Sequence, residues 1–465
     1  MAHALPLDPA PEGAAAAARA HPWRAELRAM LALALPVTLS QVGLMLMNVV
    51  DAMMVGHLSA AALAATALGT VYFYAFVAFG QGVLFALDPV VSQAVGARDA
   101  DAVAHAVQRG VVLALALAVP IMLALLPAPW VLARLGQPAE VWPTAAAFAR
   151  ASAPGVVPYL LFTVLRQTLQ AQHRTRAVVW AIVVGNVANL LLNWVFIYGR
   201  LGMPAYGAVG SAWSTTIGRW GMLATLAALG WPHLRAALRP WRADAWRPGA
   251  VGRLARLGAP IGAQQALEYG AFGAVGVAMG GLGTAAMAGH QATLNLASLT
   301  FMVPLGVSAA AAVRVGHAVG AGDAPRARRA AAAALLVGVG FMACTAVMLL
   351  IAPRPLAGLY TDDAAVLALA ASLIPIAGVF QVFDGLQVVS LGILRGAGDT
   401  RAPAVANVVG FWGLGLPIGA WLAYRAGGGP RGLWWGLVLG LAITGLVNAA
   451  LVRRRLRGAV ARVRV

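Results

Sequence analysis

Four carboxylates lie in apolar surroundings, and these are the first residues to consider for chemistry: Asp51, Asp88, Glu268 and Asp384. A charged carboxylate at the centre of a membrane-spanning helix costs about 2.5–3.5 kcal/mol, so such residues usually face a cavity and have a function. Burial raises the pKa of a carboxyl group, whereas a nearby cation lowers it. Such a group can therefore exchange a proton for another cation. We expect Asp88, near the end of an apolar run, to cap a helix or form an ion pair, and we interpret the other three as functional.

Polar side chains that could complete a site around Asp51 lie in two later apolar runs. Asn189 and Asn193 are one helical turn apart and therefore share a face, and Thr215 lies in the run that follows. Carboxylate, amide and hydroxyl oxygens together suit a proton or a hard cation. The alternative is that these groups only join membrane helices by hydrogen bonds, and for the two asparagines the sequence favours neither interpretation.

The elements that must position these residues are membrane-spanning helices. Hydrophobic residues make up 61% of the chain and charged residues 10%, a balance typical of membrane proteins. Runs long enough to cross a bilayer recur about twelve times. The expected spans are 31–50, 60–87, 105–127, 145–169, 177–198, 208–230, 258–280, 286–313, 330–351, 366–394, 403–424 and 432–452.

The positive charge is entirely arginine, and it collects in alternate connections. The chain has 33 basic residues and no lysine, and arginines on the side of the two termini outnumber those on the other side by about four to one, which predicts that both termini are cytoplasmic. The arginines on the opposite side are Arg134, Arg150, Arg200, Arg354, Arg425 and Arg431. The net charge of +18 is therefore explained by membrane topology, and we expect no nucleic-acid partner.

The sequence repeats itself at an offset of 224 residues. This offset places Pro36 on Pro260, Gly82 on Gly306 and the segment 94–97 on 318–321, and one residue later Leu169 falls on Leu394. Each copy holds an even number of spans, so both enter the membrane from the same side and are related by an axis along the membrane normal. The carboxylates are not duplicated: Asp51 falls on Val275, Glu268 on Leu44 and Asp384 on Tyr159 or Leu160.

The predicted fold is an all-α integral membrane protein with two six-helix bundles. We expect a disordered cytoplasmic tail at 1–23, an N-terminal lobe at 24–230, a cytoplasmic linker at 231–256, a C-terminal lobe at 257–452 and a basic cytoplasmic tail at 453–465.

Several activities are disfavoured by residues that the chain lacks. Without lysine there is no P-loop lysine, no Schiff-base chemistry and no Ser–Lys catalysis. The single cysteine, Cys344, gives no intramolecular disulfide, CxxC or Cys-ligated cluster. The spans contain no HExxH and no paired catalytic aspartates, so we expect no enzyme, no catalytic residues and no cofactor. A passive channel is disfavoured by the duplicated bundles.

Several segments resemble the multidrug and toxic compound extrusion (MATE) family in its NorM-like bacterial branch. They are MNVVDAMMVG around Asp51, NLLLNWVFIYG from Asn189, the long run from Ala288 to Gly320, and FQVFDGLQVVSLGILRGAGDT from Phe380. The resemblance implies a two-lobed, twelve-helix antiporter of the bacterial inner membrane. It would export amphipathic, often cationic compounds in exchange for H⁺ or Na⁺.

The same resemblance implies roles for particular residues. Asp51, Glu268 and Asp384 match acids of the first, seventh and tenth helices, while Asn189, Asn193 and Thr215 match polar positions of the first lobe. A Na⁺ ion could bind near Asp51 or near Glu268 and Asp384.

Two departures from the family pattern bear on the coupling ion. Phe380 stands where some members have a tyrosine, which removes one oxygen ligand, and its neighbour Gln381 is a further candidate modulator. Arg219, in the middle of the sixth span, is a third, and we hypothesise that it approaches Asp51.

The partners expected are the lipid bilayer and small organic substrates, with the protein acting as a monomer. The alternative function within this fold is a flippase for a lipid-linked saccharide, which would need a strongly basic cleft. The membrane spans offer few arginines besides Arg219.

Overall fold

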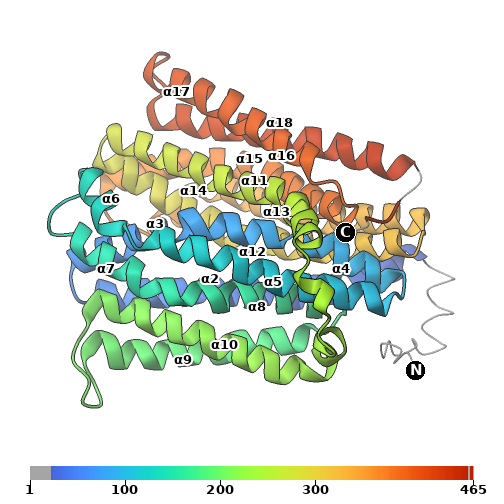
Figure 1. The fold of residues 1–465 in the computed structure, drawn as a ribbon. Coiled ribbons are helices and arrows are strands. Elements are labelled where there is room, and N and C mark those ends of the chain that lie inside the picture. The colour runs from blue at the N-terminus through green and yellow to red at the C-terminus, as the bar shows by residue number, and fades with distance from the viewer. Residues whose placement is uncertain (1–21, 459–460, 464–465) are drawn as a thin grey trace.

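Long helices that run roughly parallel build the whole molecule, as the computed structural model shows (Figure 1). The structure describes residues 22–458 and 461–463, and this part contains no strand. The first half of the chain forms α2 (Pro22–Gly56), α3 (Ala60–Leu84), α4 (Leu87–Gly96), α5 (Ala100–Leu125), α6 (Ala128–Arg134), α7 (Trp142–Ser152), α8 (Val156–Ala171), α9 (Thr175–Tyr198) and α10 (Gly207–Leu238). The second half forms α11 (Pro248–Gly281), α12 (Thr284–Gly320), α13 (Ala324–Ile351), α14 (Pro353–Gly358), α15 (Ala364–Gly396), α16 (Arg401–Asn407), α17 (Leu416–Tyr424) and α18 (Gly429–Arg457).

Three short helical segments complete the described chain. They are η1 (Ala153–Gly155) between α7 and α8, η2 (Ala243–Trp246) between α10 and α11, and the π-helix η3 (Val408–Gly415) between α16 and α17. The π-helix widens the turn directly after Asn407, and such segments are frequent at functional sites.

Ten helices or helix pairs of the described chain are long and apolar enough to cross a membrane. α10 and α11, with 32 and 34 residues, are not among these ten, although they run alongside them (Figure 1) and cover the two remaining spans that the sequence predicts. Polar residues within the helices lower their hydropathy, namely Arg219 in α10 and Gln264, Gln265 and Glu268 in α11. The prediction of an all-α, multi-pass membrane protein is therefore confirmed.

The internal repeat is visible in the turns. Asp99 accepts a hydrogen bond from the Ala102 N–H at 2.9 Å and so caps α5, and Asp323 caps α13 in the same way through the Arg326 N–H at 2.8 Å. The turns after α8 and α15 match too, because the Arg174 N–H donates to Leu169 O at 2.8 Å and the Asp399 N–H to Leu394 O at 2.9 Å. Two copies of one scaffold therefore build the molecule.

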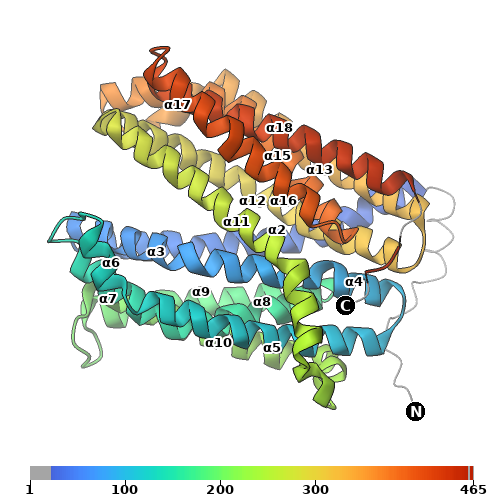
Figure 2. The same ribbon diagram turned by 45° about the horizontal axis from the view of Figure 1, so that its top comes forward.

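The two halves meet at one end and diverge toward the other (Figure 2). At the end where they meet, α4 of the first half packs against α12 of the second. Glycines permit this approach, since a Cβ at Gly316 would overlap Ser92 and one at Gly96 would overlap the His317 backbone. The described ends of the chain lie here as well, so we call this the termini end (Figure 1).

Helix α2 belongs by sequence to the first half but is shared by both. Met30, Leu33 and Val37 lie in a buried cluster with side chains of α12, α13 and α15, whereas Met47, further along α2, packs with α8, α9 and α10. The division of the chain at the linker therefore does not describe how this helix packs.

The connections are more helical than the sequence suggested. α10 continues to Leu238 and α11 begins at Pro248, so only 239–247 of the expected linker 231–256 lies between these helices. α18 likewise continues to Arg457, into the expected basic tail. Arginine is a good helix former and suits a helix C-terminus. Of the expected N-terminal tail, residues 1–21 lie outside the described residues, and Pro22 and Trp23 begin α2.

Candidate functional site

Asp51 lies at the centre of a buried hydrogen-bond network contributed by three helices. Its Oδ1 accepts from Asn193 Nδ2 at 2.6 Å, and its Oδ2 accepts from the Thr215 hydroxyl at 2.7 Å. Asn189 supports both donors, because its Nδ2 donates to Thr215 Oγ1 and its Oδ1 accepts from Asn193 Nδ2, each at 3.2 Å. The structure thus brings together the four residues that the sequence analysis grouped.

Close packing of α9 against α10 sets the spacing of this network. Both asparagine side chains are fully buried, and Asp51 is 6% exposed. A Cβ at Gly185 of α9 would overlap the Met222 side chain of α10, so glycine is needed for this approach. A buried polar group without partners is costly, and one acceptor here, Asn193 Oδ1, has none within the described chain.

Arg219 lies close enough to Asp51 for their charges to interact, but it does not contact the carboxylate. One turn beyond Thr215, its guanidinium group lies 4.4 Å from the ring centre of Phe73 and 5.2 Å from that of Tyr159, while Nη1 approaches Gly155. The described chain shows no ion pair between Arg219 and Asp51 within 4.0 Å. The faces of the two rings attract the cation, so Arg219 adds positive charge near Asp51 without touching it.

A second buried acidic site lies in the other half. Glu268 of α11 accepts hydrogen bonds through Oε2 from Asn407 Nδ2 at 3.1 Å and from Gln387 Nε2 at 3.5 Å. Asp384 of α15 is 6% exposed and close enough for its charge to interact with Glu268. The sequence analysis did not single out Asn407 or Gln387, although an amide within an apolar run is the same signal that identified Asn189.

The two candidate modulators beside Asp384 are buried away from this pair. Phe380 is 3% exposed and contacts the rings of Phe272 and Trp434 edge-on. Gln381 is fully buried and donates to Thr300 Oγ1. Neither side chain hydrogen-bonds to Glu268 or Asp384 in the described chain, so both act at most through the packing of α15.

Aromatic side chains from the two halves face each other next to Glu268. The rings of Tyr74 in α3 and Tyr269 in α11 are nearly parallel, with an interplanar angle of 5° and centres 6.4 Å apart. Tyr269 directly follows Glu268 and is 55% exposed, and one helical turn earlier Gln265 meets Gln81 of α3 at 3.5 Å. Aromatic and amide side chains therefore lie together where α3 of the first half meets α11 of the second.

The termini end is closed by polar contacts, of which two join the halves and one joins α12 to the shared helix α2. Arg314 of α12 donates two hydrogen bonds to Glu26 Oε1 of α2, at 2.6 and 2.9 Å. Asp88, in the first turn of α4, pairs with Arg395 of α15 at 3.6 Å, as its position predicted. His173 Nε2 lies 3.3 Å from His317 Nδ1.

The histidine contact has one proton arrangement when both rings are neutral. His317 Nε2 donates to Ala171 O at 2.7 Å, because a carbonyl oxygen can only accept. His317 Nδ1 is then an acceptor, and His173 Nε2 donates to it. His317 of α12 thus joins the two halves through His173 and Ala171.

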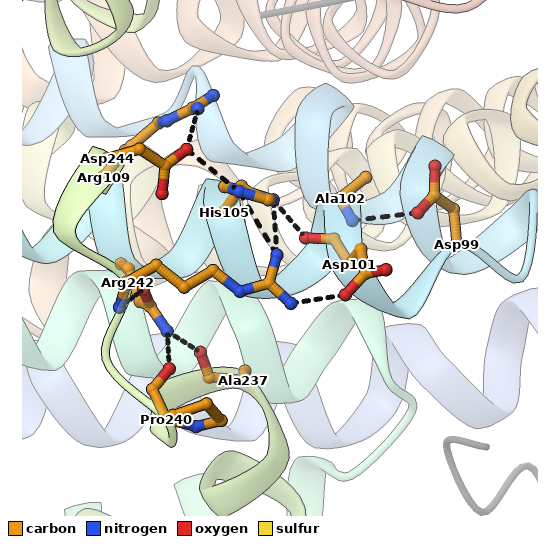
Figure 3. Close-up of polar contacts among 10 residues, drawn as sticks. Asp99, Asp101, Ala102, His105, Arg109, Ala237, Pro240, Arg242 and Asp244 are labelled. Carbon is orange, nitrogen blue, oxygen red and sulfur yellow. Dashed lines mark hydrogen bonds and ion pairs between the residues drawn. The ribbon is translucent and has the colours of Figure 1, made fainter. Parts of the chain in front are cut away.

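The linker between the halves is anchored to α5 (Figure 3). Asp244 lies 3.1 Å from His105 Nε2 and 3.2 Å from Arg109 Nη2, and Arg242 pairs with Asp101. Gln108 fixes the backbone by donating to Ala237 O and Pro240 O at 3.0 Å. These contacts connect the linker to the first half alone.

Two packed helical halves with buried polar sites define a two-lobed, multi-pass membrane protein of the transporter class. A sequence model of the MatE family matches residues 36–195 and 260–421, one match in each half. The chain belongs to the MatE family. The two matches also reproduce the internal repeat.

Relatives with named functions cover nearly the whole chain. The probable multidrug resistance protein NorM of Burkholderia mallei is 40% identical over 423 residues, which are 88% of this chain and 89% of that protein. The multidrug resistance protein MdtK of Edwardsiella ictaluri is 34% identical over 438 residues, 93% of this chain and 96% of that one. The resemblance to NorM-like proteins is thus confirmed.

Solved structures share the fold. The eukaryotic MATE transporter AtDTX14 superposes with a TM-score of 0.85 at 21% identity, covering 94% of this chain and 98% of that one. A MATE family transporter in an outward-facing conformation gives 0.83 at 20% identity, with coverage of 93% and 96%. These likenesses support the arrangement in two bundles.

Proposed function

We propose that this protein exports amphipathic, often cationic organic compounds in exchange for protons, and that Asp51 carries the coupling proton. The observation that carries the proposal is a carboxylate inside the membrane, held by Asn193 and Thr215 at 2.6 and 2.7 Å. The names of the relatives, which are multidrug resistance proteins, support the substrate class. No cofactor enters the proposal.

The direction of the hydrogen bonds in the network favours a proton over Na⁺ at Asp51. Both oxygens of Asp51 accept hydrogen bonds, so an N–H and an O–H group point at the carboxylate. A hard cation binds oxygen lone pairs and would require those donors to turn away. A proton on Asp51 needs only one acceptor, and the unpartnered Asn193 Oδ1 belongs to a side chain already in contact.

Helix α2 offers a route from the proton site to the closed end. It carries Asp51 against α9 and α10, and it carries Glu26 against Arg314 of α12. A proton on Asp51 weakens the charge-assisted bonds to Asn193 and Thr215, because a neutral acid is the poorer acceptor. The position of α2 then depends on whether Asp51 is protonated. Because a proton binds better to one conformation than to the other, it shifts the equilibrium between the two conformations.

Glu268 and Asp384 are proposed to receive the cationic part of the substrate. Tyr269 follows Glu268 and faces Tyr74 across the two halves, so a flat aromatic cation could contact a ring and a carboxylate together. Asn407 and Gln387 donate to Glu268 and so fix the position of its carboxylate. The two lobes then divide the work between proton and substrate.

The basic termini end is proposed to face the cytoplasm of a bacterium. The arginines in alternate connections follow the positive-inside pattern, which supports a topology with both described ends inside, and we propose the inner membrane as the location. We expect it to act as a monomer, since one chain supplies every member of the Asp51 network.

The arginines within the spans give little support to a flippase for lipid-linked saccharides. Such a substrate needs cations free to bind pyrophosphate. Arg166 donates to Gln41 at 3.0 Å, Arg395 pairs with Asp88, and Arg219 lies against two aromatic rings. All three already have favourable contacts, so antiport accounts better for the buried acids.

Transport in proteoliposomes tests the proposal. A fluorescent organic cation is loaded, and a pH gradient or a Na⁺ gradient is imposed separately on wild type, Asp51→Asn and the exposed-site control Glu140→Gln. We expect the pH gradient alone to drive export by wild type and control, and Asp51→Asn to bind the dye without exporting it. Export by Asp51→Asn at the wild-type rate would refute the role of Asp51, and export driven only by Na⁺ would refute the coupling ion.

A further inference from the structure

A small basic hollow at the termini end lies apart from both acidic sites. Arg253 and Arg256 of α11 and Arg401, the first residue of α16, line a space of about 380 Å³. All three side chains are exposed, and none has an ion-pair or hydrogen-bond partner within the described chain. The acid in the lining, Asp399, leaves an excess of positive charge.

The walls of this hollow are fixed by hydrogen bonds. The buried Thr400 hydroxyl donates to Leu257 O at 3.0 Å and so joins the start of α16 to α11. The tail residue Val463 packs on Gly398, and its N–H donates to Gln93 Oε1 at 2.7 Å. The arginines therefore stand on a framework that exists before any ligand arrives, which lowers the entropic cost of binding.

The depth of the hollow matches the headgroup region of a bilayer. Arg401 begins one of the candidate membrane spans, Arg401–Tyr424, and Arg256 comes just before the apolar part of α11. Side chains at the ends of spans lie at the level of lipid headgroups. Basic pockets between helices on the cytoplasmic side are a known way of binding anionic headgroups.

Arginine is suited to such a ligand. Its planar guanidinium group can donate two parallel hydrogen bonds to a phosphate. We propose that Arg253, Arg256 and Arg401 form a binding site for the phosphodiester headgroup of an anionic glycerophospholipid. The proposal does not depend on the antiport mechanism, because none of these residues contacts Asp51, Glu268 or Asp384 in the described chain.

Lipid titration of the purified, delipidated full-length protein in neutral detergent tests this site. Short-chain phosphatidylglycerol, short-chain phosphatidylcholine and inorganic phosphate are added separately, and the unfolding temperature and the mass of the intact complex are recorded. We expect phosphatidylglycerol to raise the unfolding temperature and to remain bound, while the other two do neither at the same concentration.

Charge variants locate the binding. Arg253→Gln, Arg256→Gln and Arg401→Gln should each weaken phosphatidylglycerol binding about fivefold, since each arginine near an anionic surface contributes about that factor. Arg235→Gln, an exposed arginine at the same end but outside the hollow, should change it less than about twofold. Asp399→Asn removes the acid and should strengthen binding, a gain that misfolding cannot imitate.

Three results would overturn the proposal. One is equal binding of phosphatidylcholine and phosphatidylglycerol, which would mean that the headgroup charge is not recognised. Another is an equal response to inorganic phosphate, which would identify a site for a soluble anion. The third is an equal loss of affinity in Arg235→Gln and the hollow variants, which would reduce the effect to the general charge of this end.

Discussion

Removing the charge of Glu26 should open the termini end. Glu26 and Arg314 have side chains 7% and 10% exposed, and two hydrogen bonds join them. Breaking a buried pair by neutralising one partner costs about 3 kcal/mol or more, because the other charge stays buried. Separation of α2 from α12 would let Arg314 reach water, so Glu26→Gln should shift the populations toward the open arrangement by about a hundredfold.

Distances between spin labels measure this shift directly. Arg176 of α9 and Pro325 at the start of α13 are exposed and lie on opposite halves, so each is replaced by a labelled cysteine after Cys344→Ala. We expect wild type and the exposed control Glu140→Gln to give one short distance, and Glu26→Gln to add a longer one.

A double variant distinguishes loss of charge balance from loss of packing. Glu26→Gln combined with Arg314→Met leaves no unpaired charge, so the closed distance should return. The reasoning is refuted if Glu26→Gln keeps the wild-type distance, or if the double variant is as open as the single one.

Three further predictions follow from local contacts. Gly316→Ala would force a Cβ against Ser92, so it should abolish export while Gly340→Ala, whose added Cβ meets nothing within 4 Å, should not, as measured by dye export. Asn407→Leu removes the 3.1 Å donor to Glu268 and should weaken binding of a cationic dye about tenfold, whereas unchanged affinity would remove Glu268 from the substrate site. The Ala102 N–H and Arg462 hold the pKa of Asp99 below its ordinary value, so their stabilising contribution is complete above about pH 4 and is lost as the pH falls through the lowered pKa. Asp99→Asn keeps the cap but loses the ion pair. The unfolding temperature of this variant should be slightly below that of wild type at pH 7 and should change less in acid. The difference in the free energy of unfolding should be under about 1 kcal/mol because Asp99 is partly exposed.

The members of the Asp51 network could be predicted because polar side chains are rare in apolar spans and two of them share one helix face. Asn189 and Asn193 share a helix face because of their spacing. Asp51 and Thr215 were identified because a polar group in a membrane span costs free energy. The repeat added the topology, since copied turns such as those at Asp99 and Asp323 imply copied helices. Both inferences use periodicities that a sequence displays directly.

Contacts that depend on tertiary packing could not be predicted in this way. Arg219 lies one turn from Thr215, and from the sequence an ion pair with Asp51 was reasonable. The aromatic rings that hold it come from Phe73 and Tyr159, which no spacing rule relates to it. Asn407 beside Glu268 was missed for another reason, because it has no second amide one helical turn away to mark its face as polar.

The failure of the repeat to copy its acids explains how one scaffold can hold two different sites. At the offset of the repeat, the position of Asp51 is occupied by Val275 in the second half, and that of Glu268 by Leu44 in the first. Val275 is 2% exposed within an apolar cluster, so the second half has apolar packing where the first has its network. Because the lobes match in backbone and differ in charge, a proton bound at Asp51 has no counterpart at the equivalent position of the second lobe. Such asymmetry allows a change at Asp51 to move α2 relative to α12 without requiring the same change at Glu268.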